Sequence, residues 1–226
     1  MSRRVVVTID GPAGAGKSTV AKRLAARLGY GLLDTGAIYR SVALGALQTG
    51  VDLLDGRSLG DLARNLQIRF ELEGDVNHVL VDDINVTSQI RSPGSLRPRR
   101  GCLVTRRSGK RCWDLQRRLG ASGGVVVEGR DTGTVVFPQA AAKFFLTASP
   151  EIRATRRVAE LQAAGKDVDF DTTVREIRER DKLDSERAVA PMVAAVDAQL
   201  VDSSGLALDD VVATLEARVR AVVSLP

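Results

Sequence analysis

A buried strand that leads directly into a glycine loop and then a helix is the feature that most constrains this chain. Residues 4–9 are mostly apolar, residues 11–18 read G-P-A-G-A-G-K-S, and residues 16–28 have the apolar spacing of a helix. The pattern G-x-x-x-x-G-K-[ST] between a strand and a helix is typical of a P-loop, whose backbone N–H groups surround the phosphates of a nucleotide. The sequence therefore predicts a nucleoside triphosphate site near the start of the chain.

The residues of this loop have distinct predicted roles. Its glycines permit backbone conformations in which successive N–H groups point into one hollow, and the N-terminus of the following helix adds partial positive charge. We expect Lys17 to reach the β- and γ-phosphates and the Ser18 hydroxyl to bind the Mg²⁺ that accompanies ATP. The alternative is a simple glycine-rich turn, which the lysine, the hydroxyl and both flanking elements disfavour. The predicted ATP-binding residues of the loop are Gly11, Pro12, Ala13, Gly14, Ala15, Gly16, Lys17, Ser18 and Thr19.

Strand and helix patterns alternate along the rest of the chain, which predicts a three-layer α/β fold. A length of 226 residues and 44% apolar content fit one domain with a sizeable core. Three short alternating segments predict a small antiparallel unit inside this chain. The small strands are expected at 67–72, 76–81 and 84–86, the other strands at 31–33, 124–128, 143–146 and 199–202, and further helices at 35–48, 59–66, 150–164, 171–187 and 208–223.

The net charge of +5 is concentrated in residues 93–112, which hold seven basic residues and no acidic one. The rest of the chain has 26 basic and 28 acidic residues, so the basicity is not a property of the whole surface. The segment also contains glycine and proline breakers without any helical or strand period, and we expect helix formation there to be weak. A charge run is usually a solvated face. Binding to nucleic acid through this segment is therefore the minority alternative, and no nucleic-acid partner is expected.

Other features limit the possible locations and sites. The chain has no run of about 18 apolar residues and leaves no room for a signal peptide before the first strand, so we expect no membrane partner and a cytoplasmic location. Cys102 and Cys112 have nine residues between them and no partner histidine nearby, which is not a metal or redox pattern. His78 stands alone in a predicted strand, where a structural role is expected.

Four arginine-bearing motifs follow the P-loop. They span residues 34–40, 128–131, 153–157 and 180–187. The first two lie at predicted strand ends, where open α/β sheets bind ligands, and arginine is suited to holding phosphate oxygens in pairs. A lone arginine on a helix is more often a solvated surface charge, so the other two motifs are less specific. Helix capping and metal binding remain equal alternatives for the acidic residues Asp34, Glu128 and Asp131.

Together these motifs resemble the bacterial cytidylate kinases of the nucleoside monophosphate kinase group. The resemblance rests on IDGPAGAGKST, LLDTGAIYR, EGRDTGTVVFP, KFFLTASPEIRATRR and the ERD…DSERAVAP region ending at Pro191, whose order covers almost the whole chain. Members of this family transfer the γ-phosphate of ATP to CMP or dCMP, in pyrimidine nucleotide metabolism. The resemblance implies a single P-loop kinase domain over 1–226 with a five-stranded parallel sheet. It also implies a monophosphate-binding lobe at about 35–120 with a small sheet insert at about 67–87, and a short lid at about 150–187.

The resemblance also implies residue roles outside the P-loop. The CMP-binding residues would be Asp34, Thr35, Tyr39, Arg40, Arg130, Asp131, Arg180, Asp184 and Arg187. The lid arginines Arg153, Arg156 and Arg157 would contact ATP. The catalytic residues would be Lys17, Arg130, Asp131, Arg157 and Arg187. Asp184 matches a residue that touches the pentose, where CMP and dCMP differ. The implied partners are ATP, CMP or dCMP, with Mg²⁺ bound to ATP, and the implied state is a monomer.

Residues 93–112 depart from the family. The family usually has a helix-rich segment of similar length there, with a serine and an arginine that help bind the acceptor nucleotide. Equal spacing places these two positions near Arg100 and Gly109, and neither residue matches. We hypothesise two compensating frameshifts in a GC-rich gene, near residues 93–94 and 112–113. The alternatives are genuine divergence in which Lys110 or Arg111 replaces the arginine, impaired CMP binding, or a P-loop kinase of another small acceptor such as shikimate.

Overall fold

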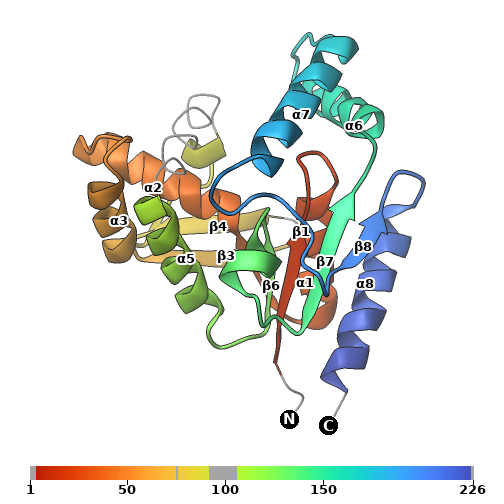
Figure 1. Cartoon of the computed structure of the whole chain (residues 1–226), viewed down its shortest axis with the longest axis horizontal. Helices are drawn as coiled ribbons and strands as arrows, with labels where there is room; N and C mark the ends of the chain where they lie inside the picture. The colour runs from red at the N-terminus through yellow and green to blue at the C-terminus, as the bar shows by residue number, and fades with distance from the viewer. Residues whose placement is uncertain (1–3, 75, 92–105, 225–226) are drawn as a thin grey trace.

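A computed structural model describes residues 4–74, 76–91 and 106–224, and it has three layers around a parallel sheet (Figure 1). The sheet has five parallel strands, as the family resemblance implies, and their order is β2-β6-β1-β7-β8. The strands are β1 (Val6–Asp10), β2 (Gly31–Asp34), β6 (Val125–Glu128), β7 (Ala142–Thr147) and β8 (Gln199–Asp202). Because all five run the same way, their carboxyl ends share one edge of the sheet, and the P-loop begins at that edge directly after Asp10.

Helices cover both faces of this sheet, and Figure 1 shows α6 and α7 above its carboxyl edge. The α-helices are α1 (Lys17–Leu28), α2 (Thr35–Thr49), α3 (Gly56–Asn65), α5 (Arg106–Gly120), α6 (Pro150–Ala163), α7 (Phe170–Ser185) and α8 (Leu208–Val223). Two short turns of helix were not expected from the sequence, namely the 3₁₀-helix η1 (Gln89–Arg91) and the π-helix η3 (Thr132–Val136). Helix α3 begins earlier than expected because Asp55 caps it, accepting hydrogen bonds from the N–H groups of Arg57 (2.9 Å) and Ser58 (3.2 Å).

Strand β6, which lies between β2 and β1, shows why the parallel strands are continuously apolar. Val126 lies in the core with Leu24 of α1 and Leu215 of α8 on one face of the sheet. Its neighbours Val125 and Val127 lie in a second core with α2, α5 and the small sheet on the other face. Since both faces are buried, every residue of the strand must be apolar until Glu128 at its carboxyl end.

The small antiparallel sheet expected from the sequence is present. It consists of β3 (Ile68–Glu73), β4 (Val76–Val81) and β5 (Ile84–Asn85), in the order β3-β4-β5. Asp82 and Asp83 connect the last two strands with positive φ angles of 49° and 66°. Such left-handed pairs are typical of the tight turns of hairpins, and aspartate tolerates them better than most residues. Ile68 and Val79 bury this sheet against the second core.

The expectation of irregular structure through residue 112 is wrong for residues 106–112, because α5 begins at Arg106. Cys112 is 1% exposed and packs with Tyr39 of α2 and Leu59 of α3. This buried contact offsets the low helix propensity of Gly109, which the sequence pattern alone could not reveal. The remaining residues of the basic segment, with Arg97, Arg99, Arg100 and Cys102, lie outside the described residues. Within the described part of the chain, no helix is long and apolar enough to cross a membrane.

Candidate active site

The P-loop has a backbone that only glycine adopts easily at three positions. Gly11, Gly14 and Gly16 have φ angles of +138°, +78° and +89°. A Cβ at Gly11 would overlap the carbonyl of Leu146 at the end of β7, and one at Gly14 would lie 3.1 Å from the Cβ of Arg153. The loop therefore lies closely against β7 and α6, and a side chain at either position would push it out of place.

Lys17 is buried at the centre of the site. The residue is only 6% exposed, and its Nζ donates a 2.6 Å hydrogen bond to the carbonyl of Pro12. Burial lowers the pKa of Lys17 well below its usual value and the positive charge of Arg130 adds to this, while Glu128 and Asp10 oppose it. A buried cation next to another cation is stabilised by an anion, which a triphosphate would supply.

Ser18 and Glu128 form a pair of oxygen ligands beside this lysine. The Ser18 hydroxyl donates a 2.8 Å hydrogen bond to Oε2 of Glu128, the last residue of β6. Burial raises the pKa of Glu128 to about 7, helped by the negative charge of Asp34 and opposed by Lys17. A hydroxyl and a carboxylate at this distance suit a hard divalent cation, which prefers oxygen ligands. The residues present therefore fit a magnesium ion that arrives with a nucleotide.

The loop after β6 brings the acceptor-side residues together. Burial raises the pKa of Asp131 to about 6, against the opposing positive charge of Arg187. Burial also raises the pKa of Tyr39 well above its usual value, and the nearby negative charge of Asp131 adds to this. Arg130 forms an ion pair with Asp184 at 3.1 Å. Side chains from α2, from the loop after β6 and from the end of α7 thus meet at one place.

Asp34 and Thr35, where β2 ends and α2 begins, make contacts beside this group of residues. Asp34 caps the helix by accepting a 2.8 Å hydrogen bond from the N–H of Ala37, and it also pairs with Arg40 at 3.0 Å. The Thr35 hydroxyl, on a residue 4% exposed, donates to the carbonyl of Glu128 at 2.8 Å. In this structure both side chains therefore fix the strand ends around the site.

Buried guanidinium nitrogens remain without partners at this site. Among the residues that the structure describes, Nε of Arg40 and Nη2 of Arg187 are buried and have no hydrogen-bond partner. Buried polar groups are nearly always hydrogen-bonded, and a charged donor left unpaired is costly. An anionic ligand would satisfy both groups.

The three predicted lid arginines have different surroundings. Arg153 is 3% exposed, and its nitrogens contact the carbonyls of Ala148 (2.8 Å) and Ala13 (3.2 Å) and the carboxylate of Asp181 (2.7 Å). Each nitrogen of its guanidinium thus has a partner, and together these contacts tie the P-loop to α6 and α7.

The next two arginines of α6 are less enclosed. Arg156 donates to the Ser203 carbonyl at 2.8 Å, and the Ser203 hydroxyl lies 3.2 Å from the carbonyl of Ala15 in the P-loop. Arg157 pairs with Glu160 of its own helix at 2.8 Å and has 43% of its side chain exposed. The structure thus brings Lys17, Arg130, Asp131 and Arg187 together and leaves Arg157 on the surface of α6.

Sequence reasoning did not assign Asp10, Ser203 or Trp113 to the site, and left Glu128 undecided. Asp10 is the last residue of β1 and faces Lys17, and the side chain of Trp113 lies beside Asp131. Position at a carboxyl strand end is the one signal that could have found Asp10 and Glu128. Ser203 and Trp113 come near the site only through the packing of distant segments.

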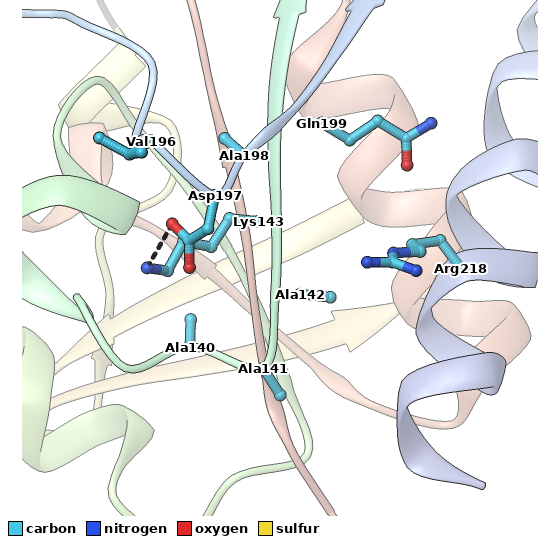
Figure 2. Close-up of a pocket in the computed structure, with 9 residues that line it drawn as sticks. All are labelled: Ala140, Ala141, Ala142, Lys143, Val196, Asp197, Ala198, Gln199 and Arg218. Carbon is cyan, nitrogen blue, oxygen red and sulfur yellow. Dashed lines mark hydrogen bonds and ion pairs between the residues drawn. The ribbon is translucent and has the colours of Figure 1, made fainter. Parts of the chain in front are cut away.

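Two hollows lie away from this edge of the sheet. One of about 360 Å³ lies at the amino ends of β7 and β8, where Figure 2 shows the ion pair of Lys143 with Asp197 (2.9 Å) and the side chain of Arg218. Another of about 510 Å³ is lined by residues that include Arg117 and Phe137. Neither is lined by any residue that the sequence assigns to binding, so the candidate site is at the carboxyl edge of the sheet.

Comparison with known proteins identifies the family. A family model described as "Cytidylate kinase" matches residues 7–221. The chain belongs to the cytidylate kinase family. Curated relatives named cytidylate kinase include one from Pelotomaculum thermopropionicum, 48% identical over 218 residues that cover 95% of this chain and 96% of the relative. Another, from Vibrio cholerae, is 46% identical over 211 residues, 93% of this chain and 94% of the relative. This kinase is therefore an enzyme of the nucleoside monophosphate kinase group.

A solved structure supports the fold alone. The crystal structure of an uncharacterised protein from Eubacterium ventriosum is similar to this cytidylate kinase family member, with a TM-score of 0.55 and 11% sequence identity. The match covers 98% of this chain and 100% of that chain. The predicted α/β fold with a five-stranded parallel sheet and a small antiparallel sheet is confirmed.

Proposed function

We propose that this enzyme transfers the γ-phosphate of ATP to CMP or dCMP and forms ADP and CDP or dCDP. The observation that carries the proposal is the convergence of cations at the carboxyl edge of the sheet. Burial is the main cause of the lowered pKa of Lys17, and the positive charges of Arg130 and Arg180 lower it further. Three like charges therefore lie near one another. Glu128 and Asp10 offset part of this charge. Among the described residues, the buried Nε of Arg40 and Nη2 of Arg187 still lack partners, and two phosphorylated substrates would supply them. The family and the names of the relatives favour a cytidine nucleotide as the acceptor.

The reaction needs positioned charge and little other chemistry. The bond between the γ-phosphorus and the oxygen of the β-phosphate breaks, and a bond forms to an oxygen of the acceptor phosphate. No general base is required, because the acceptor phosphate is already ionised. Lys17 and the arginines would stabilise the charge of the transferred group, which is the main source of catalysis in phosphoryl transfer.

We propose Ser18 as the residue that binds Mg²⁺ together with ATP, with Glu128 beside it. When bound, the ion would neutralise charge between the β- and γ-phosphates. Ser18 would then have to give up its hydrogen bond to Glu128, whose carboxylate lies near Lys17. The predicted contacts of the P-loop backbone with ATP remain part of this proposal.

The acceptor would lie between α2, the loop after β6 and the end of α7. Arg40, Arg130 and Arg187 would hold its phosphate and base, with Arg180, Asp34, Thr35, Tyr39 and Asp131 around it. Asp184 would touch the pentose after it leaves Arg130, to which it is paired in this structure. A lobe at about 35–120 and a lid at about 150–187 would close over the substrates and exclude water, which otherwise competes as nucleophile. We also propose that the enzyme acts as a cytoplasmic monomer.

A panel of acceptors tests this proposal. Purified enzyme with ATP and Mg²⁺ is offered CMP, dCMP, UMP, AMP, GMP and shikimate in a coupled assay for ADP. We expect CMP or dCMP to give the highest kcat/KM, and Lys17→Ala to lower kcat by roughly two orders of magnitude or more, as loss of a charge-stabilising group does. Circular dichroism should show that the variant is folded. Preference for another acceptor, or full turnover by Lys17→Ala, would contradict the proposal.

A variant of this function is an enzyme with impaired CMP binding. It is favoured by the positions near Arg100 and Gly109, where the residues expected of the family are missing. A CMP KM far above that of a relative measured alongside would support it. Resequencing the gene tests the frameshift hypothesis, since an intact frame together with normal CMP phosphorylation would reject it.

A further inference from the structure

We propose that Asp10 is a positioning residue that fixes the acceptor loop, residues 129–133, relative to the ATP loop. This inference rests on the proposed function. Asp10 is the last residue of β1 and is directly followed by Gly11, the first residue of the P-loop. Its carboxylate thus lies at the origin of the donor site, while its hydrogen bonds go to the acceptor side.

The carboxylate of Asp10 binds the acceptor loop through both oxygens. Its Oδ1 accepts hydrogen bonds from the N–H (2.9 Å) and the hydroxyl (2.8 Å) of Thr132. Its Oδ2 accepts one from the N–H of Gly133 at 2.7 Å. These donors are the first residues of η3, and they directly follow Arg130 and Asp131. Asp10 therefore holds the segment that presents both acceptor-side groups.

The contact is enclosed and leaves little freedom. Asp10 is 4% exposed and Thr132 is fully buried. A Cβ at Gly133 would lie 2.9 Å from the Thr8 hydroxyl, and one at Gly129 would lie 2.8 Å from the Thr35 hydroxyl. The loop thus packs against β1 on one side and α2 on the other. The N–H groups at the start of a helix lack partners within it, and here the carboxylate supplies them.

The same carboxylate acts on the donor side by charge. Among the groups around Lys17, Asp10 is one of the two carboxylates that oppose the lowering of its pKa. A further backbone hydrogen bond ties the acceptor loop to β1, because the N–H of Gly129 donates to the carbonyl of Ile9 at 3.0 Å. Displacement of the acceptor loop would therefore change the distance between the transferred phosphate and its acceptor, to which phosphoryl transfer is sensitive.

A purely structural role would predict loss of stability without a selective effect on one substrate. The positioning role predicts that the affinity for CMP falls while the affinity for ATP is kept. In Asp10→Asn, one side-chain oxygen can still accept from Thr132, but the amide NH₂ faces the N–H of Gly133. The acceptor loop should then move, while the P-loop backbone keeps its glycine conformation.

The test compares substrate affinities in Asp10→Asn, with calorimetric titration of ATP and of CMP and with steady-state kinetics. We expect the Kd and KM for CMP to rise roughly tenfold or more and kcat to fall similarly, from loss of a charge-assisted hydrogen bond. The Kd for ATP should change by less than about threefold, since Glu128 still supports the positive charge of Lys17 and the P-loop glycines are unchanged.

The variants Thr132→Val and Thr132→Ser form a matched pair. Valine has the shape of threonine but lacks the hydroxyl that donates to Asp10, and serine keeps it. We expect a smaller rise in the CMP KM for Thr132→Val, again without a matching change for ATP, and values close to the wild type for Thr132→Ser. This pair decides the question if Asp10→Asn does not fold.

Several outcomes overturn the inference. Equal changes for ATP and CMP, or a lower melting temperature with unchanged kinetics, would make Asp10 merely structural. So would identical kinetics of Thr132→Val and Thr132→Ser. If the wild type prefers another acceptor, the proposed function fails. The affinities of the variants for ATP and for that acceptor are then compared in the same way. If the wild type phosphorylates CMP and no such difference is found, the function stands and the role of Asp10 fails.

Discussion

Arg153 and Arg157 lie one turn apart on α6, and replacing each by alanine should have very different effects on stability. Arg153 is buried, with 4% of its side chain exposed, and pairs with Asp181, which has 23% of its side chain exposed. Removing one partner of a buried ion pair costs about 3–5 kcal/mol, and the partial exposure of Asp181 favours the lower end, about 3 kcal/mol. In a protein of this size, about 3 kcal/mol corresponds to a fall in melting temperature of roughly 6–12 °C.

Arg157 is the matched control on the same helix. Its pair with Glu160 is exposed, and such pairs contribute about 0.5 kcal/mol or less, or roughly 1–2 °C. If Arg157 acts as the predicted lid residue, Arg157→Ala should lower kcat/KM for ATP without destabilising the fold. Arg153→Ala should lower the melting temperature and also raise the KM for ATP, because the carbonyl of Ala13 in the P-loop loses its partner.

The assay is thermal unfolding followed by circular dichroism, with kinetics measured well below both melting temperatures. Equal melting temperatures for the two variants would refute the reasoning, since burial of the Arg153 ion pair is its entire basis. A large loss of stability in Arg157→Ala would refute it equally.

Three further predictions concern the site and the core. Burial raises the pKa of Asp131 from 3.8 to about 6, so the folded state keeps a proton between about pH 4 and pH 6 and its stability falls as pH rises through that range, by about 3 kcal/mol at most. Asp131→Asn should make this fall smaller but not abolish it, since burial also raises the pKa of Glu128 and of Asp10. Urea unfolding at several pH values measures the slope, and a slope equal to that of the wild type would contradict the assignment. Gly11→Ala should abolish ATP binding in a titration, because its Cβ would overlap the carbonyl of Leu146; normal ATP affinity would mean that the loop can shift freely. Leu24→Ala, at a fully buried position, should lower the free energy of unfolding by about 3 kcal/mol in a denaturant titration. Leu47→Ala, at a position 58% exposed, should change it by less than about 0.5 kcal/mol. Similar losses in the two variants would contradict the described core.

Much of the site could be predicted because its motifs are local. The P-loop needs its glycines, its lysine and its hydroxyl in one short segment, so residues 11–18 reveal it without any tertiary contact. Arg40, Arg130 and Asp131 follow strand ends, and parallel strands bring their carboxyl ends to one edge whatever the rest of the chain does. The structure places Lys17, Arg130, Asp131 and Arg187 at that edge together.

Other features could not be predicted because they depend on partners far away in the sequence. Helix α5 starts within a segment rich in breakers because Cys112 packs with α2 and α3. The π-helix η3 begins where Asp10, more than a hundred residues earlier, accepts its first N–H groups. Neither partner is visible in the local pattern of the segment.

The sequence by itself determined the α/β fold, the parallel sheet, the small antiparallel sheet, the phosphate loop and the family, because each follows from residue types at short, fixed spacings. Only the tertiary structure decided what individual charged residues do within that plan. Arg153 and Arg157 are alike in the sequence, yet one is enclosed by Ala13, Ala148 and Asp181 and the other is solvated. Burial and the partners supplied by distant segments set the energy of a charge, and neither is encoded in its immediate neighbours.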